Sequence, residues 1–363
     1  MPTDKKIPFA QLLDALRNPD APVKPRYLYR LSDLERSELD QLKKAWPDVP
    51  LWRKQALLED IEELSGSDTL LDFEEFCRFA IQDEDPRVRA LAVRTLWEYE
   101  DKTLIPLLLQ TLNQDRAGEV RSEAAGALGR YVFMGELEEL SPATHKRVED
   151  ALLTACQSDA VEEVRRSALE ALGYSSRPEV TRLIERAYAS KDKNWIASAL
   201  FAMGRSANED HWRPQVLAML SNQLPLLRTE AARAAGELEI AEAVPVLLEM
   251  LDDPDTNARQ ASIWSLSQLG GEGVREALQA IYESSEDEQE IELVDEALEN
   301  LTFVEGARMM PMFNFPEDDD QDGEEDDFDE DDFFDDDSDE DDLDEADYED
   351  LDEFSDDDEE ARY

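Results

Sequence analysis

The sequence has 363 residues, and its 91 Asp and Glu against 36 Lys and Arg give a formal net charge of -55 at pH 7. Nucleic-acid affinity depends mainly on Lys and Arg side chains that neutralise phosphates, so this balance argues against direct DNA or RNA binding. The first residues hold no apolar run of signal-peptide length, and no stretch approaches the roughly 18 apolar residues of a membrane span. We therefore expect a cytoplasmic protein that does not enter membranes, and the high net charge favours a monomer.

Residues 1–31 are expected to cap the open N-terminal end of a repeat array, which would otherwise expose an apolar face. A proline-rich stretch follows a short amphipathic helix in this segment, and Ser32 and Glu35 then match a capping box that opens the next helix. A partner-docking arm is the alternative interpretation. The apolar residues with helical spacing are Phe9, Leu12, Leu13 and Leu16.

An internal repeat organises residues 32–301. The pattern D-x-x-x-x-V-R-x-x-A-x-x-A-L-G occurs at Asp115–Gly129 and again at Asp159–Gly173. We call its arginine position the arginine slot; it recurs at steps of 31 to 36 residues, with one step of 44 residues. A steady period of this length is typical of stacked structural repeats. The slots hold Arg53, Arg89, Arg121, Arg165, Ile196, Arg228, Arg259 and Ile291.

Each repeat is predicted to form two helices joined by a turn. In one second helix, Val164, Ala168 and Leu172 share an apolar stripe. In one first helix, Val244 to Leu251, Pro245 lies early, where its missing N–H is tolerated. Such a unit can bury its stripe only against its neighbours, so we expect an all-α superhelix of about eight helical hairpins.

The repeats resemble the HEAT-repeat family, in particular its short E-Z (phycobilisome-lyase-like) class. The residues that carry the resemblance are the turn acids Asp83, Asp115, Asp159 and Asp253, the arginine that follows each of them, and the small apolar residues after each arginine. The resemblance implies a right-handed α-solenoid of the armadillo type, whose second helices line a concave face. It does not by itself imply a reaction.

An acidic residue lies six positions before most slot arginines, at a position that we call the acid slot. Where the arginine is replaced, at Ile196 and Ile291, the acid slot holds Ser190 and Ser285. This joint loss favours a structural ladder, in which a carboxylate meets a guanidinium on the same or the next repeat, over a row of ligand-binding arginines. Arg53 is an exception, with Pro47 in its acid slot, and Asn222 precedes Arg228. The four complete pairs are Asp83 and Arg89, Asp115 and Arg121, Asp159 and Arg165, and Asp253 and Arg259.

The long step of the repeat marks an insertion at about residues 132–151. Insertions in solenoids usually emerge on one face and often carry binding specificity. The insertion therefore has two equally favoured interpretations. It is either a segment that binds a partner, or a longer loop with a lengthened first helix from about Pro142 to Cys156.

The sequence carries no positive signal for catalysis, and we expect no cofactor. The related deoxyhypusine hydroxylases hold two irons through repeated His-Glu dipeptides, whereas neither His145 nor His211 precedes a Glu. These histidines and the two cysteines, Cys77 and Cys156, also lack zinc-site spacing, and the cysteines fit reduced, buried thiols. Phycobilin lyases share the repeat type and need no metal, so a bilin-lyase-like activity stays an alternative.

One position on the second helices suggests a binding surface. Five residues after the arginine slot, three consecutive repeats carry Phe201, Arg233 and Trp264, although polar residues are expected there. Aromatic residues and arginine are enriched in interface hot spots, so we hypothesise a groove that grips a protein segment. The alternative is that Phe201 and Trp264 pack against adjacent helices. Tyr99 and Tyr131, two residues past the position that ends the repeat pattern in glycine, form a second candidate in neighbouring repeats.

The C-terminal part divides into a linker, residues 302–316, and an acidic tail, residues 317–363. The tail holds 32 acidic residues and one basic residue, a composition that predicts disorder. Its interspersed aromatic residues allow docking on a basic partner as well as a solubilising role. The sequence as a whole predicts a non-catalytic protein-binding scaffold, with a bilin-lyase-like maturation factor or an acidic-tail chaperone for basic proteins as alternatives.

Overall fold

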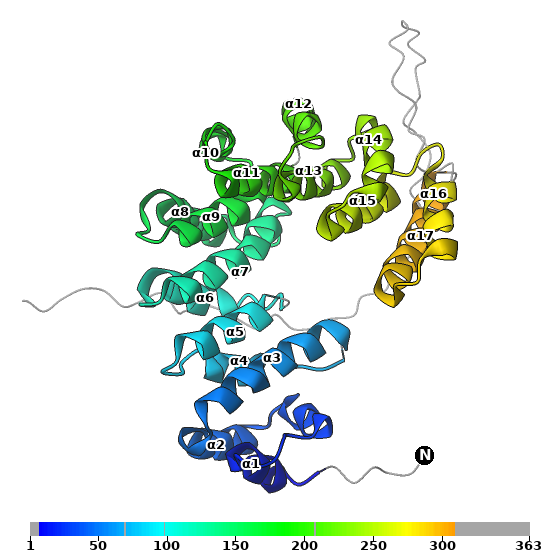
Figure 1. Cartoon of the computed structure of the whole chain (residues 1–363). Helices are drawn as coiled ribbons and strands as arrows, with labels where there is room; N and C mark the ends of the chain where they lie inside the picture. Colours follow the sequence, from blue (N-terminus) through cyan, green and yellow to red (C-terminus); the bar gives the residue numbers. More distant parts are fainter. Residues whose placement is uncertain (1–6, 69, 98, 207, 309–363) are drawn as a thin grey trace, which may run out of the picture. The chain divides into compact units, whose positions relative to one another are not determined.

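The computed structural model describes residues 7–308 except 69, 98 and 207, and within these ranges the chain forms helices joined by turns (Figure 1). The predicted acidic tail lies outside the described residues. None of the described helices is both long and apolar enough to cross a membrane.

The described chain is an all-α solenoid in which successive helices form pairs (Figure 1). The described residues hold eight such pairs, and each second helix carries one arginine slot near its start. Short 3-10 turns lie at Pro25–Leu31, Trp46–Asp48, Leu172–Tyr174, Ala241–Ala243 and Met250–Asp252. The pairs are α2 (Arg36–Ala45) with α3 (Leu51–Ser67), α4 (Glu74–Ala80) with α5 (Pro86–Leu96), α6 (Leu104–Gln114) with α7 (Gly118–Glu136), α8 (Pro142–Ser158) with α9 (Glu162–Ala171), α10 (Pro178–Tyr188) with α11 (Lys193–Arg205), α12 (Glu209–Met219) with α13 (Pro225–Glu237), α14 (Val244–Glu249) with α15 (Thr256–Leu269), and α16 (Val274–Ser284) with α17 (Glu288–Arg308).

The second helices pack against one another in chain order, from α3 to α17. Glycines near their C-terminal ends permit this close approach. A Cβ added to Gly173 would lie 2.8 Å from the carbonyl oxygen of Ala202, and one added to Gly204 would lie 3.1 Å from the Cα of Ala234. Side chains at these positions would push neighbouring repeats apart, so the small-residue run of the repeat sets the spacing between second helices.

The helix α1 (Phe9–Arg17) precedes the pairs and contacts α2. Its apolar stripe is buried, and Leu12 and Leu16 have no exposed surface. The slot arginine Arg53 is also buried here, and its Nη2 donates to the backbone carbonyls of Asn18 and Ala21, at 2.6 and 2.9 Å. Arg53 therefore ties the segment after α1 to the first helix pair.

Two boundaries differ from those predicted. The helix α2 begins after Glu35, whose N–H bonds to the Glu38 carboxylate, and not at Ser32. The Ser32 hydroxyl instead accepts the N–H of Asp72 at 2.9 Å, which is a tertiary bond that local sequence cannot reveal. At the other end, α17 continues to Arg308, so the first residues of the predicted linker are helical.

The inserted residues mainly lengthen helices. The helix α7 continues past Gly129 to Glu136, and α8 begins at Pro142 with Ser141 as its N-cap. Only residues 137–141 form the connection between them. The helix α8 matches the predicted lengthened first helix, but residues 137–141 do not form the predicted longer loop, because the second helix α7 is lengthened as well.

Candidate partner-binding groove

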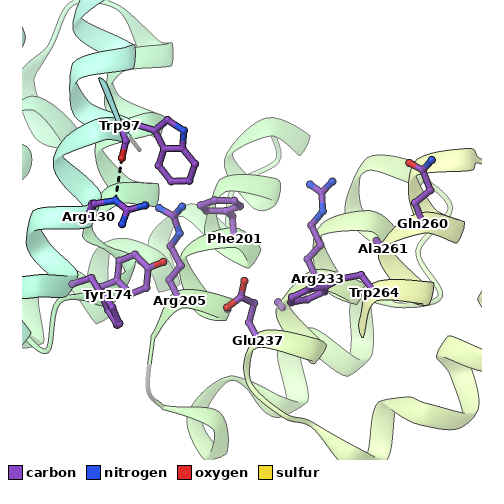
Figure 2. Close-up of a pocket in the computed structure, with 14 residues that line it drawn as sticks. Trp97, Arg130, Tyr174, Phe201, Arg205, Arg233, Glu237, Gln260, Ala261 and Trp264 are labelled. Atoms are coloured by element: carbon purple, nitrogen blue, oxygen red, sulfur yellow. Dashed lines mark hydrogen bonds between the residues drawn. The ribbon is translucent and has the colours of Figure 1, made fainter. Parts of the chain in front are cut away.

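The three residues five positions beyond the arginine slot line one hollow. Phe201 on α11, Arg233 on α13 and Trp264 on α15 all face a space of about 600 Å³ over the second helices (Figure 2). Their helices pack side by side, so a position repeated once per unit recurs along one surface. The structure therefore brings together residues that lie far apart in the sequence.

Further side chains complete the hollow, and none of them was among the residues predicted from the sequence. Trp97 and Phe133 lie at its edge with 45% and 43% of their surface exposed. Four more share a position nine residues beyond the arginine slot, one helical turn after the first set, so they lie on the same helix face. Comparing that position across repeats would have found them. They are Arg130, Tyr174, Arg205 and Glu237.

Arg205 is held rigidly between aromatic rings. Its guanidinium lies 4.2 Å from the ring centre of Phe201 and 5.0 Å from that of Tyr174, and it donates to the carbonyl of Glu170 at 3.3 Å. Burial lowers the pKa of Arg205 from its usual value, but that value is so high that the side chain stays charged. The groove thus presents a fixed cation framed by aromatic faces.

A similar pair of an arginine and an aromatic ring lies beside Arg205 in the hollow (Figure 2). Arg130 lies over the ring of Trp97 at 5.4 Å, and its Nε donates to the Trp97 carbonyl at 3.0 Å (Figure 2). Its Nη1 also contacts the Glu100 carboxylate at 2.6 Å. These contacts hold the exposed indole in place.

Phe201 and Trp264 both pack and line the hollow. Each side chain is half-buried, and Trp264 rests against Gly236, where an added Cβ would lie 2.8 Å from the Trp264 ring. The two interpretations of these aromatic residues are therefore compatible, because one edge of the ring contacts the neighbouring helix while the rest meets the groove.

An adjoining hollow of about 370 Å³ shares Trp97, Gly126, Phe201 and Arg205 with the first, so the groove continues toward α5. Its polar wall includes Glu170, whose pKa is raised by burial although Ser198 donates to it at 2.5 Å. The groove therefore combines aromatic surface, arginines and partly desolvated carboxyl groups.

In the second candidate pair, burial rules out Tyr131 as a binding surface, whereas Tyr99 is half-buried. Tyr131 is only 1% exposed, and its hydroxyl donates to the carbonyl of Asp101 at 2.8 Å. The hydroxyl of Tyr99 accepts the N–H of Phe73 at 2.7 Å. Both tyrosines stabilise the connections between repeats, because their apolar rings join the core and their hydroxyls satisfy buried backbone groups.

The acid and arginine slots form a ladder between repeats. Nε and Nη2 of Arg89 donate to both carboxylate oxygens of Asp115 in the next repeat, each at 2.8 Å, and Arg121 binds Asp159 in the same way. We call each such pair a rung. Arg228 and Asp253 form a third rung, with distances of 2.6 and 2.7 Å.

The pairing at an offset of six residues involves the backbone. Nη1 of Arg121 donates to the carbonyl of Asp115, 2.9 Å away, while the carboxylate of Asp115 accepts from the previous repeat. The sequence allowed each carboxylate to pair with an arginine of the same repeat or of a neighbouring repeat. In the structure, the side-chain pairs form between neighbouring repeats. Asp83 differs, since Lys54 and Trp46 donate to its carboxylate at 2.8 and 2.6 Å.

A carboxylate in a rung should make stability depend on pH. Hydrogen bonds from Arg228 hold the pKa of Asp253 below its usual value of about 3.9, so its contribution is complete above that pH and is lost as pH falls through the lowered pKa. We expect Asp253→Asn to lower the free energy of unfolding by about 1–2 kcal/mol at pH 7, and the difference from wild type to shrink below about pH 4. Urea unfolding at several pH values measures this. Asp252→Asn, at the exposed neighbouring residue, should show no such trend.

The sequence model of the HEAT-repeat family matches residues 74–173 and 213–299, which together make up more than half of the chain. The chain belongs to the HEAT-repeat family. No curated protein matches it. Among solved structures, the complex of CpcE and CpcF of phycocyanin lyase from a Nostoc species is 19% identical, covering 63% of this chain and 94% of that chain, with a TM-score of 0.42. Human deoxyhypusine hydroxylase is 19% identical, covering 81% of this chain and 96% of that chain, with a TM-score of 0.35.

One cluster in this HEAT array has the donor set of a metal site. Glu136, His145 and Glu149, within the insertion, hold ligand atoms within 4.8 Å of one another. Nε2 of His145 lies 3.8 and 3.7 Å from the two carboxylates and has no hydrogen-bond partner among the described residues. However, Ser175 already donates to Glu149, and the N–H of Ser176 donates to Glu136 at 2.9 Å. The cluster joins α7 and α8 to the segment before α10.

The two cysteines lie in the helical core as expected. Cys77 and Cys156 are both free and buried. Burial raises the pKa of Cys156 to about 11 and that of Cys77 further, so neither thiol is activated as a nucleophile.

Proposed function

We propose that this HEAT-repeat protein is a non-catalytic scaffold that binds a segment of a partner protein in the groove over α5 to α15. The observation that carries the proposal is the groove itself, in which successive repeats place aromatic and arginine side chains around one open space. Aromatic residues and arginine dominate the binding energy of many interfaces. The groove also supplies the polar groups that orient a bound peptide backbone.

The rigidity of the groove supports this proposal. Arg205 and Arg130 are fixed against aromatic rings before any partner arrives, so binding would not have to order them. Trp97 and Phe133 expose large apolar surface at the edge of the hollow, where a partner side chain would cover it. We propose a monomer that acts in the cytoplasm, consistent with its free thiols. A role of the acidic tail in solubility or in binding basic partners stays a prediction.

The groove proposal is tested with peptides selected from a random 12-residue display library on the full-length protein. Trp264→Ala and Trp97→Ala should each weaken the selected peptides about tenfold to a hundredfold, because each removes a large aromatic contact surface. Fluorescence anisotropy measures the binding, and far-UV circular dichroism checks that helicity is intact.

Trp52→Ala is the matched control, since Trp52 is 53% exposed but lies on α3, outside the groove. It should leave peptide affinity unchanged. Trp264 also packs against Gly236, so a loss of fold in Trp264→Ala would be uninformative about binding, and Trp97→Ala then decides. Selected peptides that bind both groove variants as tightly as wild type would contradict the proposal.

A further inference from the structure

The ladder between repeats is open at one junction. Arg165 occupies the arginine slot of α9, but the acid slot of the next repeat holds Ser190, whose side chain is too short to reach it as a carboxylate would. Nη1 of Arg165 still donates to the carbonyl of Asp159 at 2.7 Å, as in the complete rungs. The nearest carboxylate to Nη2 in the described chain is that of Glu162, 3.8 Å away and half-exposed.

Ser190 supports the same turn as an aspartate in the acid slot, but it carries no charge. Its hydroxyl accepts the N–H of Asp192 at 3.1 Å, just as the carboxylate of Asp159 accepts the N–H of Val161 at 2.8 Å in a complete rung. Serine and aspartate both support such a turn, so the fold tolerates either residue. The replacement therefore changes only the surroundings of Nε and Nη2 of Arg165, the atoms that meet the carboxylate in a complete rung.

A second serine junction provides an internal comparison. Ser285 follows the slot arginine Arg259, and there Glu290 takes over the missing role. Its carboxylate lies 3.6 Å from Nε of Arg259 and accepts the Ser285 hydroxyl at 2.7 Å. No described residue replaces the acid in this way at Ser190.

A cavity of about 720 Å³ lies at the open junction. Arg165, Arg182 and Arg186 line it, and Arg182 and Arg186 are exposed and form no ion pair among the described residues. Glu179 is the one carboxylate in its wall, and Arg177 donates to it at 2.9 Å through Nε. Trp195 contributes apolar surface. This local excess of arginine is unusual in a chain with a net charge of -55.

We infer that this cavity is a second recognition site, which binds a carboxylate side chain from an acidic segment of a partner protein. The bound Asp or Glu would complete the rung by accepting from Nε and Nη2 of Arg165, in the geometry that Asp159 shows with Arg121. Arg182 and Arg186 lie on one face of α10 at a four-residue spacing and would meet further acidic residues of the segment. The site is separate from the aromatic groove, with which it shares no lining residue.

The test uses the full-length protein and a fluorescein-labelled peptide, Gly-Glu-Leu-Asp-Glu-Gly, with an otherwise identical peptide that carries Gln and Asn. We expect the acidic peptide to bind at least tenfold more tightly than the amide peptide, and added salt to weaken it. Ser190→Asp should place the protein's own carboxylate on Arg165. That variant should lose peptide binding about tenfold while its unfolding temperature rises, a combination that disruption of the site by misfolding could not produce.

Arg186→Gln should also weaken the acidic peptide, because it removes an exposed charge. Arg259→Gln is the matched control and should bind as wild type does, since its slot already faces Glu290. Equal binding of the two peptides, or undiminished binding by Ser190→Asp, would overturn the inference. Inorganic phosphate that displaces the peptide, together with tighter binding of a phosphoserine peptide, would reassign the site to phosphate. A carbodiimide cross-link from Lys191 to a carboxylate of the same chain would overturn the assignment to a partner.

Discussion

Asp159→Ala is expected to lower the free energy of unfolding by about 2–3 kcal/mol. The carboxylate accepts two hydrogen bonds from Arg121 at 2.8 Å and the N–H of Val161 at 2.8 Å, and both partners of the rung are largely buried. Its removal leaves a guanidinium with little access to water and breaks the turn between α8 and α9. Urea unfolding followed by circular dichroism measures the loss through the midpoint, which is the appropriate quantity for a repeat array.

The same slot in the next repeat provides the control. Ser190→Ala removes a side chain that supports the turn but bonds to no guanidinium in the described chain, so its cost should stay below about 0.5 kcal/mol. An Arg121→Met, Asp159→Ala double variant should be less destabilised than the sum of the single variants, because the two side chains act as a pair. A midpoint for Asp159→Ala close to that of Ser190→Ala would show that the rungs do not hold the repeats together.

Gly173→Ala and Gly126→Ala are expected to change stability in opposite directions, although both add one methyl group near a second helix. At Gly173 the new Cβ would lie 2.8 Å from the carbonyl oxygen of Ala202 and 2.9 Å from its Cα, so the backbone of α11 would have to move. We expect a loss of about 1–3 kcal/mol. At Gly126 nothing lies within 4 Å, and alanine in mid-helix should stabilise by about 0.5–1 kcal/mol.

Thermal and urea unfolding of the two variants under the same conditions would measure this reversal. Gly126 lines the groove, so the peptide affinity of its alanine variant also reports how closely a ligand approaches α7. A stabilised Gly173→Ala variant would mean that α9 and α11 are not held as close together as their packing indicates.

Much of the fold could be predicted because its signals repeat. The apolar stripes, the glycines and the slots recur with one period, and each unit contacts mainly its neighbours, so the pattern of one repeat describes them all. The predicted positions of Phe201, Arg233 and Trp264 on one surface follow from the same regularity. The boundary at Ser32 could not be predicted, because its partner is the backbone of Asp72, forty residues away.

The candidate sites were less accessible to sequence reasoning. Tyr131 and Trp264 both looked like candidates for partner contact, yet only the packing of adjacent repeats decides that Tyr131 is buried while Trp264 lines an open hollow. The cluster of Glu136, His145 and Glu149 depends on the angle between two lengthened helices, which no spacing in the sequence specifies.

The sequence by itself determined the HEAT architecture, its period and the residue types of the ladder. Helix periodicity and turn chemistry are local properties, and the same local pattern recurs in each repeat. The tertiary structure decided what each charged residue meets. A slot arginine donates to a backbone carbonyl of its own repeat and to the carboxylate in the acid slot of the next repeat. Ser190 therefore removes the carboxylate partner of Arg165, which lies one repeat earlier. Ion pairs depend on distances between repeats, and those distances exist only once the second helices have packed.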